Sequence, residues 1–315
     1  MNRSFENKST LITGGSSGIG LALAKQLAAS GANVCIVARD AKRLDDACRQ
    51  VADCRISEKQ TIDTLQADVT NPNTLIPLLK KHMRVRGVPD LLINCASAAQ
   101  PGEFDQQDID VFRWMMDVNY LGTVYAIKGI VSEMIARGSG HIVNFSSIVG
   151  LVGLYGYSAY GASKFAVHGF SDVLRQELKS TGVRVSIVFP SDTQTPQLEY
   201  EERFKPPITK VIAGATQGKI LSADAVAAAV LKGIARGRYV ILPSADSIWM
   251  YRAVRLVGDL AYPILDWLVH WAQRKIDRLK DGQRQENKTD PDKVSGQQVN
   301  ELHPDGSQQD HVDHP

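Results

Sequence analysis

The sequence has no long uninterrupted hydrophobic run and no cluster of Lys and Arg residues. Residues 1–8 are polar and lead directly into a short apolar segment, without the apolar core of a signal peptide, so we expect a cytoplasmic location. The formal net charge of +2 argues against a nucleic-acid partner. Apolar residues make up 43% of the 315 positions and aromatic residues 7%, as in a globular protein with a large core.

Cysteine is also scarce. The four residues Cys35, Cys48, Cys54 and Cys95 show no metal-ligand spacing, so no metal site is predicted. Cys35 and Cys95 lie in apolar runs, which indicates buried free thiols in a reducing compartment.

Short apolar runs alternate with helix-length segments over most of the chain. Residues 19–29 have helical periodicity, and the strand-like runs are residues 9–13, 33–38, 61–67, 91–96, 141–146 and 183–189. This alternation predicts an α/β fold, a doubly wound parallel sheet with helices on both faces. Residues 281–315 are polar and rich in Gly and Pro, so we expect a disordered tail.

A glycine-rich turn joins the first strand to the first helix. Residues 13–20 read Thr-Gly-Gly-Ser-Ser-Gly-Ile-Gly. Glycine lets a diphosphate approach the backbone, and the free N–H groups of a helix beginning near Gly18 would bind it. An ordinary turn is the alternative, but the place directly after an N-terminal strand indicates a dinucleotide site.

The end of the second strand predicts which nicotinamide cofactor is used. Arg39 follows this strand, with Lys42 and Arg43 close behind. An arginine suits the 2′-phosphate of NADP, and Asp40 is better placed as the N-cap of the next helix than as a ribose ligand. A solvated charge cluster is the alternative, and it is stronger for Lys42 than for Arg39. Asp68, after the third strand, is expected to accept from the adenine amino group.

Tyr160 and Lys164 stand at i and i+4, on one face of an expected helix. We expect the ammonium of Lys164 to lower the pKa of the phenol, and Ser147 to hydrogen-bond the substrate oxygen. Such a group suits proton transfer to a carbonyl while a hydride moves at carbon. The same spacing is common on helix surfaces, so the interpretation depends on the dinucleotide site.

Asn119 lies inside a segment with a helical pattern, where Asn is a poor helix former. We expect a polar role for it, such as anchoring a water beside Lys164. Capping of a helix at a kink is the alternative.

Together these motifs resemble the short-chain dehydrogenase/reductase family over roughly residues 9–242. The resemblance implies a Rossmann-type sheet with a seventh strand at residues 239–242, in a catalytic domain of residues 1–243. It also implies a catalytic group formed by Asn119, Ser147, Tyr160 and Lys164. Ser147 has the family's spacing to Tyr160, and Ser146 would point to the opposite face of the strand.

The same resemblance places NADP at the carboxyl ends of the strands. The residues expected to contact it are Gly14, Ser16, Ser17, Gly18, Ile19, Gly20, Arg39, Arg43, Asp68, Val69, Asn94, Tyr160, Lys164, Pro190, Thr193 and Thr195.

Several positions depart from the usual family pattern. Cys95 and Ser97 stand where the family usually has Asn and Gly, and Ser191 follows Pro190 where Gly is usual. Residues 190–196 and 201–206 look like the 3-ketodihydrosphingosine reductase branch, which implies reduction of a long-chain keto-lipid with NADPH. Steroid, retinoid or 3-oxoacyl substrates are the alternatives. A non-catalytic NADP-binding scaffold at a membrane is a third hypothesis, and it would require a damaged catalytic group.

The C-terminal part of the sequence predicts an amphipathic helical arm at residues 244–280. The apolar stripe of this arm consists of Trp249, Leu256, Val257, Leu260, Ile264, Trp267, Leu268 and Trp271. Charged residues lie on the other face, and Pro263 is expected to kink or divide the helix. The stripe fits a peripheral membrane helix, or docking on the protein's own body or a second subunit.

Residues 195–221 follow the sixth strand and show no pattern of a strand or long helix in their first half. We expect a lid that binds substrate there. Glu199, Glu201 and Glu202 lie in this segment and are candidates to bind an ammonium group, although a solvated acidic patch is the simpler interpretation for at least two of them.

Overall fold

The computed structural model describes residues 3–216 and 220–289. The chain divides into two compact units between Val269 and His270, and the first unit holds the sheet and the candidate site. Residues 244–269 of the expected arm therefore belong to the same compact unit as the expected domain of residues 1–243.

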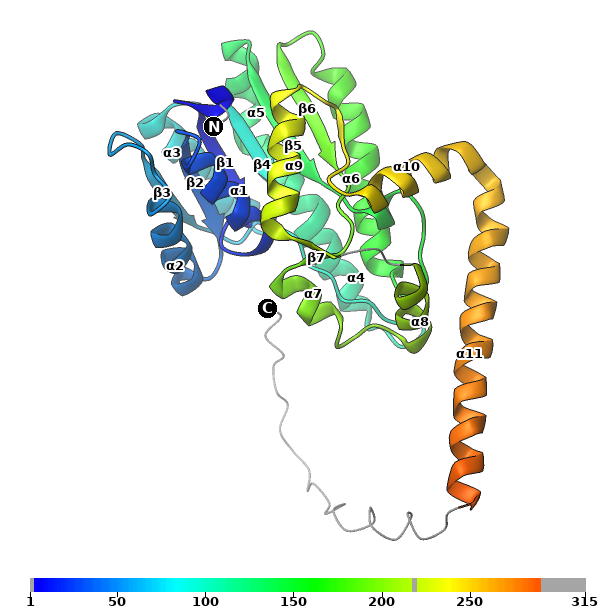
Figure 1. Cartoon of the computed structure of the whole chain (residues 1–315). Helices are drawn as coiled ribbons and strands as arrows, with labels where there is room; N and C mark the ends of the chain where they lie inside the picture. Colours follow the sequence, from blue (N-terminus) through cyan, green and yellow to red (C-terminus); the bar gives the residue numbers. More distant parts are fainter. Residues whose placement is uncertain (1–2, 217–219, 290–315) are drawn as a thin grey trace. The chain divides into compact units, whose positions relative to one another are not determined.

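A seven-stranded parallel sheet forms the centre of the first unit, in the order β3-β2-β1-β4-β5-β6-β9 (Figure 1). Its strands are β1 (Ser9–Thr13), β2 (Asn33–Ala38), β3 (Ile62–Gln66), β4 (Leu91–Asn94), β5 (Gly140–Phe145), β6 (Val183–Val188) and β9 (Val240–Ile241). The predicted fold is confirmed, including the seventh strand. Each predicted run contains its strand or overlaps it to within two residues at either end, because buried parallel strands are continuous apolar runs.

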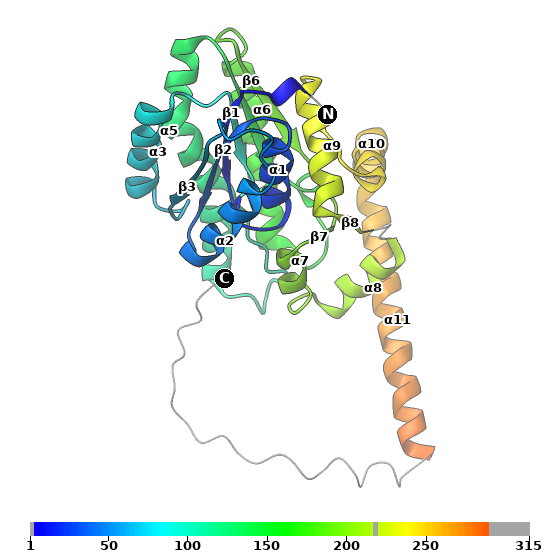
Figure 2. The same ribbon diagram turned by 60° about the vertical axis from the view of Figure 1, so that its left-hand side comes forward.

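Helices cover both faces of this sheet (Figures 1 and 2). One face packs against α1 (Gly18–Ala28), α2 (Ala41–Ala52) and α9 (Ala223–Ala235). The other packs against α3 (Pro72–Arg86), α5 (Gly122–Arg137) and α6 (Ser158–Glu177). Strand order reverses between β1 and β4, and ligands of such sheets bind at the carboxyl ends of the strands at this point.

A π-helical turn, η2 (Met116–Leu121), joins α4 (Ile109–Met115) to α5 and carries Asn119. The predicted helical segment is therefore interrupted by one wide turn. Turns of this kind are rare and occur often at functional sites.

Short elements order the segment that was expected to be a lid. β7 (Thr193–Gln194) pairs with β8 (Leu221–Ser222), and α7 (Pro196–Glu201) and α8 (Pro207–Thr216) lie between them. α7 forms because Thr195 caps it and Pro196 stands at its first position. The sequence pattern did not reveal α7, because a six-residue helix is too short to show periodicity.

The C-terminal helices break at a different place from the predicted one. α10 (Ala245–Val257) is followed by the 3₁₀ turns of η4 (Gly258–Leu260) and by α11 (Ala261–Thr289). Gly258, with φ of 55°, makes the break. Pro263 lies in the first turn of α11, where no intrahelical N–H bond is lost.

The expected tail boundary at residue 281 lies inside α11, and residues 290–315 lie outside the described residues. Among residues 3–216 and 220–289, no helix is both long enough and apolar enough to cross a bilayer. The remaining short helices are η1 (Arg3–Phe5) and η3 (Ile148–Gly150).

Candidate active site

The turn between β1 and α1 brings backbone groups together without side chains between them. Gly14 has φ of 69°, and a Cβ there would lie 2.7 Å from the backbone of Ala96. A Cβ on Gly20 would lie 2.2 Å from the carbonyl oxygen of Gly14. Ser17 is the N-cap of α1 but its side chain makes no capping hydrogen bond. The turn, with half-buried Ser16 and Ile19, therefore presents helix N–H groups that fit a diphosphate.

The loop after β6 lies against this turn. A Cβ on Gly18 would lie 3.1 Å from the side chain of Thr195, which caps α7 through the N–H of Leu198. The hydroxyl of Thr193 donates to the carbonyl of Ser191 at 2.9 Å, and the carbonyl of Pro190 accepts from Ile148 at 3.1 Å. Predicted cofactor residues from the turn after β1 and from the loop after β6 are thus neighbours in the structure.

The end of β2 presents the predicted basic residues. Arg39 and Arg43 are exposed, and the carboxylate of Asp40 accepts from the N–H of Arg43 at 2.9 Å as the N-cap of α2. Asp40 thus has the capping position that the sequence predicts. The guanidinium of Arg39 stands at the carboxyl end of β2, the edge at which a 2′-phosphate would bind.

Three further predicted cofactor residues lie at the ends of β3 and β4. Asp68 is exposed, and one of its oxygens accepts from both the N–H and the hydroxyl of Thr70. Val69 is buried. Asn94 is buried. Its side-chain nitrogen donates to the side-chain oxygen of Asn144 at 2.9 Å, while its side-chain oxygen, Oδ1, has no partner among the described residues.

Ser147, Tyr160 and Lys164 come together at the carboxyl end of β5 and the first turns of α6. The ammonium of Lys164 is buried, lies 5.5 Å from the ring centroid of Tyr160 and donates to the carbonyl of Phe145 at 3.1 Å. The hydroxyl of Ser147 lies near enough to the phenol of Tyr160 to lower its pKa. The hydroxyl of Ser146 instead donates to the carbonyl of Lys164, so adjacent serines point apart as expected.

The electrostatics of Tyr160 differ from the expectation. Burial raises the pKa of its phenol, the carboxylate of Glu201 raises it further, and the hydroxyl of Ser147 only partly opposes this. Burial lowers the pKa of Lys164 to about 8. We predicted a lowered pKa for Tyr160, and in the protein alone this is wrong, because burial of the phenol and the charge of Glu201 raise its pKa. The phenol is therefore held in its protonated form.

Asn119, on η2, hydrogen-bonds the loop after β4 and helix α6. Its amide oxygen accepts from the N–H of Ala98 at 2.8 Å, and its amide nitrogen donates to the carbonyl of Ala98 and the hydroxyl of Ser163, each at 2.9 Å. Ser163 in turn donates to the carbonyl of Tyr160. Both amide hydrogens are thus used by protein acceptors, and water anchoring by Asn119 stays a prediction.

Ser163 and the carbonyl of Phe145 are site groups that the sequence analysis does not identify. Ser163 follows Tyr160 by three residues, so its place on the same helix face was a usable signal. The carbonyl of Phe145 carries no such signal, because every residue has one.

The sequence and fold match known proteins over most of the chain. Residues 8–205 match the short chain dehydrogenase family. The chain belongs to this family. It is 36% identical over 230 residues to "3-dehydrosphinganine reductase" of Danio rerio, covering 73% of this chain and 69% of that protein. It is 37% identical over 253 residues to "3-ketodihydrosphingosine reductase" of Dictyostelium discoideum, covering 75% of each.

Solved structures of other short-chain dehydrogenases share the fold. One from Burkholderia phymatum in complex with NAD has a TM-score of 0.70 and 23% identity, over 82% of this chain and 96% of that one. Another from Sphingobium yanoikuyae in complex with NADPH has a TM-score of 0.67 and 28% identity, over 81% and 95%.

Two departures of this short-chain dehydrogenase from the usual pattern lie near the catalytic group. Burial raises the pKa of the Cys95 thiol to about 12, and the positive charge of Lys164 opposes this shift. The hydroxyl oxygen of Ser97 is buried. All four cysteines are free thiols. Cys35 is buried, as predicted, whereas Cys95, for which burial was also predicted, is half-buried, as are Cys48 and Cys54.

Proposed function

We propose that this chain reduces the keto group of 3-ketodihydrosphingosine with NADPH and produces dihydrosphingosine. The observation that carries the proposal is the identity of 36% and 37% to two reductases named for this reaction, each covered over more than two thirds of its length. The presence of Ser147, Tyr160 and Lys164 in one buried group supports a catalytic role rather than that of a scaffold.

The roles of the side chains follow from their surroundings. Ser147 orients the carbonyl by donating to its oxygen, and Tyr160 donates its phenolic proton to the same oxygen. A raised pKa keeps Tyr160 protonated at neutral pH, which is the form that reduction requires. Lys164 stabilises the phenolate that remains and binds the nicotinamide ribose. When bound, NADPH supplies the hydride for the carbonyl carbon.

NADP is proposed over NAD because of Arg39. This guanidinium can bind a 2′-phosphate with charge-assisted hydrogen bonds, and Asp40, the competing acidic residue, is engaged as a helix cap. The glycine-rich turn would hold the diphosphate, and Asp68 keeps a carboxylate oxygen at the edge where adenine would lie.

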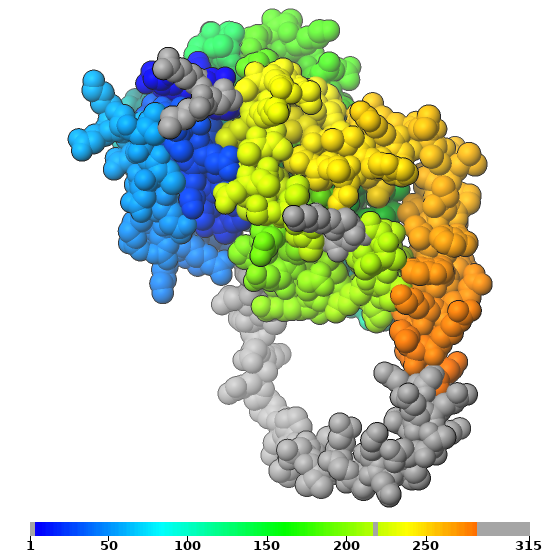
Figure 3. Space-filling view, in the orientation of Figure 1, coloured from blue at the N-terminus to red at the C-terminus, as the bar shows by residue number. Residues whose placement is uncertain are grey.

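A membrane surface is the proposed place where the lipid is met. In α10 and the start of α11, several apolar side chains of the predicted stripe point to solvent, among them Trp249, which is 77% exposed, and Leu256, which is 88% exposed. Figure 3 shows α10 at the surface of the first unit. An exposed set of this kind, accompanied by Arg252 and Arg255, suits a lipid interface.

The direct test is NADPH oxidation by purified protein with a panel of keto compounds. The panel contains 3-ketodihydrosphingosine, a 3-oxosteroid, a retinaldehyde and a 3-oxoacyl thioester. We expect the highest kcat/KM with 3-ketodihydrosphingosine and dihydrosphingosine as product by mass spectrometry. A higher value with any other member would contradict the proposed substrate.

A further inference from the structure

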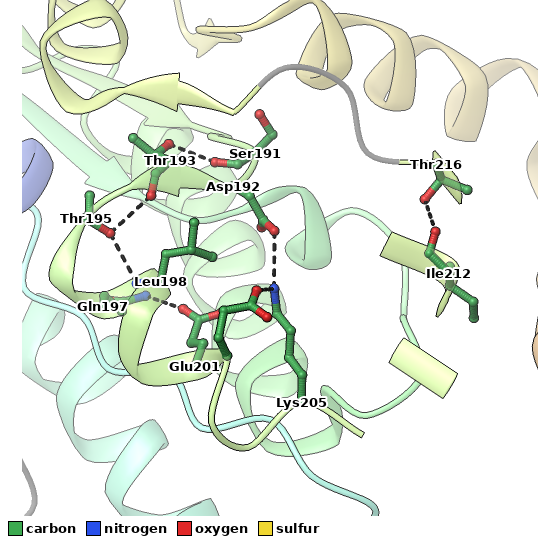
Figure 4. A network of polar contacts seen from close by, with 11 residues as sticks. Ser191, Asp192, Thr193, Thr195, Gln197, Leu198, Glu201, Lys205, Ile212 and Thr216 are labelled. Carbon is green, nitrogen blue, oxygen red and sulfur yellow. Dashed lines mark hydrogen bonds and ion pairs between the residues drawn. The ribbon is translucent and has the colours of Figure 1, made fainter. Parts of the chain in front are cut away.

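The segment that follows β6 contains three glutamates, and the structure separates them sharply. Glu201 is 7% exposed, whereas Glu199 and Glu202 are exposed. Glu201 stands on the face of α7 that also carries Gln197, and the amide of Gln197 donates to its carboxylate at 2.9 Å (Figure 4). Only one of the three acidic side chains is therefore directed into the protein.

Glu201 lies within electrostatic reach of the catalytic group. Its negative charge raises the pKa of Tyr160, of Tyr157 and of Lys164. Burial raises the pKa of Glu201 itself to about 7, against the effects of Gln197, Lys205 and Lys164. A carboxylate beside the phenol favours its protonated form and disfavours the phenolate that proton donation leaves.

Lys205 acts electrostatically on Glu201, but its ion pairs are with other carboxylates. Lys205 pairs with Glu202 and, at 3.4 Å, with Asp192 (Figure 4). Among the residues that the structure describes, Glu201 forms no ion pair within 4.0 Å, and a buried carboxylate without a cation is costly. This combination predicts that a cation from outside the protein completes the site.

We propose that Glu201 binds the ammonium group of a 2-amino ketone and makes the enzyme selective for amino ketones. This inference rests on the proposed function. In 3-ketodihydrosphingosine the amine is attached to the carbon next to the carbonyl. A group that binds the amine must therefore lie beside the side chains that bind the carbonyl oxygen. α7, which carries Glu201, has its N-cap Thr195 against Gly18 of the cofactor turn. Its Tyr200 donates to Gln100 in the loop after β4, so this helix borders the site.

The substrate pair that tests this is 3-ketodihydrosphingosine and its deamino analogue, 1-hydroxyoctadecan-3-one, in the same detergent micelles at pH 7. A hydrogen bond to a charged group changes binding by about 10- to 100-fold. We expect wild-type kcat/KM to favour the amino ketone by that factor. We expect Glu201→Gln to remove this preference by lowering kcat/KM for the amino ketone relative to the deamino analogue, because any change at Tyr160 acts on both substrates equally.

Glu199→Gln is the matched control, because it removes the same charge from an exposed position on the same helix. It should leave both substrates unchanged, and the NADPH dissociation constant of each variant reports whether the cofactor domain is folded. Equal losses on both substrates in Glu201→Gln would show a structural role and overturn the proposal.

The wild-type protein provides a test that needs no variant. If it reduces both ketones equally well, the selectivity is absent and Glu201 does not bind the amine, although the reductase function stands. If it reduces neither ketone but oxidises NADPH with another carbonyl compound, the proposed function fails and this inference fails with it.

Discussion

At the residue scale, Tyr160 is the group on which the proposed chemistry depends most. Its phenol is buried against Ser147 and Lys164, and burial keeps it protonated. This differs from a simple account in which the lysine makes the tyrosine acidic. The protein alone favours the acid that reduction consumes, and in the proposed mechanism Lys164 acts on the phenolate formed during turnover.

Tyr160→Phe keeps the ring and its packing but removes the proton. We expect kcat to fall at least ~100-fold, the scale of general acid catalysis, with NADPH binding retained. Steady-state assays and a fluorescence titration of NADPH measure the two effects. Near-normal turnover would contradict the role given to this residue.

Arg39→Ala should separate the two nicotinamide cofactors. Loss of charge-assisted hydrogen bonds to the 2′-phosphate should raise the KM for NADPH by about 10- to 100-fold, with little change for NADH. Lys42→Ala, an exposed cation three residues away, is the control and should change neither constant strongly. Equal effects of Arg39→Ala on both cofactors would show that Arg39 does not bind the phosphate.

His141 should make the fold sensitive to acid. Its Nε2 lies 2.7 Å from the hydroxyl of Ser186, which donates its own proton to the carbonyl of Arg238, so Nε2 carries a proton and the buried Nδ1 does not. Burial lowers the pKa of His141 from 6.5 to about 4. Between these values the unfolded chain binds a proton that the folded chain does not.

The free energy of unfolding should therefore be unaffected by His141 above pH 6.5. As the pH drops from 6.5 toward 4, titration of this residue should lower it by about 3 kcal/mol. Urea unfolding at pH 7 and pH 4.5 measures the difference. His141→Gln keeps a donor for Ser186 but does not titrate, so its stability should depend less on pH. An unchanged dependence would exclude His141 as the source.

At the element scale, the π-helical turn η2 holds the loop after β4 against α6. Asn119 is the connection, because its side chain satisfies both the N–H and the carbonyl of Ala98 and reaches Ser163 on α6. An ordinary α-helical turn would rotate this residue away from one of these partners. The turn thus has a structural role whatever its part in catalysis.

Asn119→Ala should leave buried backbone groups of Ala98 without partners. Each unsatisfied buried group costs about 1–3 kcal/mol, so we expect the free energy of unfolding to fall by at least about 2 kcal/mol. Urea denaturation measures this, with Asn73→Ala on the exposed surface of α3 as the control. A loss as small as that of the control would show that the loop does not depend on Asn119.

At the scale of the whole molecule, the C-terminal helices have two different faces. The ring centroids of Tyr251 and Phe189 are 6.1 Å apart, and the hydroxyls of Ser244 and Ser191 are hydrogen-bonded. α10 therefore supports the loop beside the site. Trp249 and Leu256 face solvent on the same helix. Ending the chain at residue 244 would therefore remove packing as well as the exposed stripe.

Surface substitutions test the proposed membrane contact more cleanly. Burying a large apolar side chain stabilises binding by roughly 1.5–3 kcal/mol, so a few such residues are enough for reversible attachment. We expect full-length protein to co-sediment with anionic vesicles, and joint replacement of Trp249, Leu256, Leu260 and Trp267 by Ser to abolish this while NADPH binding persists.

The control for this experiment replaces Ile56 and Val85 by Ser. These side chains are also exposed, but they belong to other parts of the surface. The control should sediment like the wild type. If the wild-type protein stays in the supernatant, the stripe binds protein instead, and its oligomeric state becomes the relevant measurement.

The features that the sequence determined by itself are those that local patterns encode. Apolar runs predicted the strands of the sheet because buried parallel strands are continuous in sequence, and the glycine-rich turn was recognisable from its place after β1. The spacing of Tyr160 and Lys164 predicted that both side chains lie on one helix face, and both residues belong to helix α6.

The tertiary structure alone decided the features that depend on distant neighbours. Which of Glu199, Glu201 and Glu202 is buried follows from the packing of α7, and the pKa of Tyr160 is raised because desolvation sums over every group around it. The break at Gly258 instead of Pro263 has the same origin. A proline is tolerated or disruptive according to where its helix begins, and that start depends on contacts that no local pattern records.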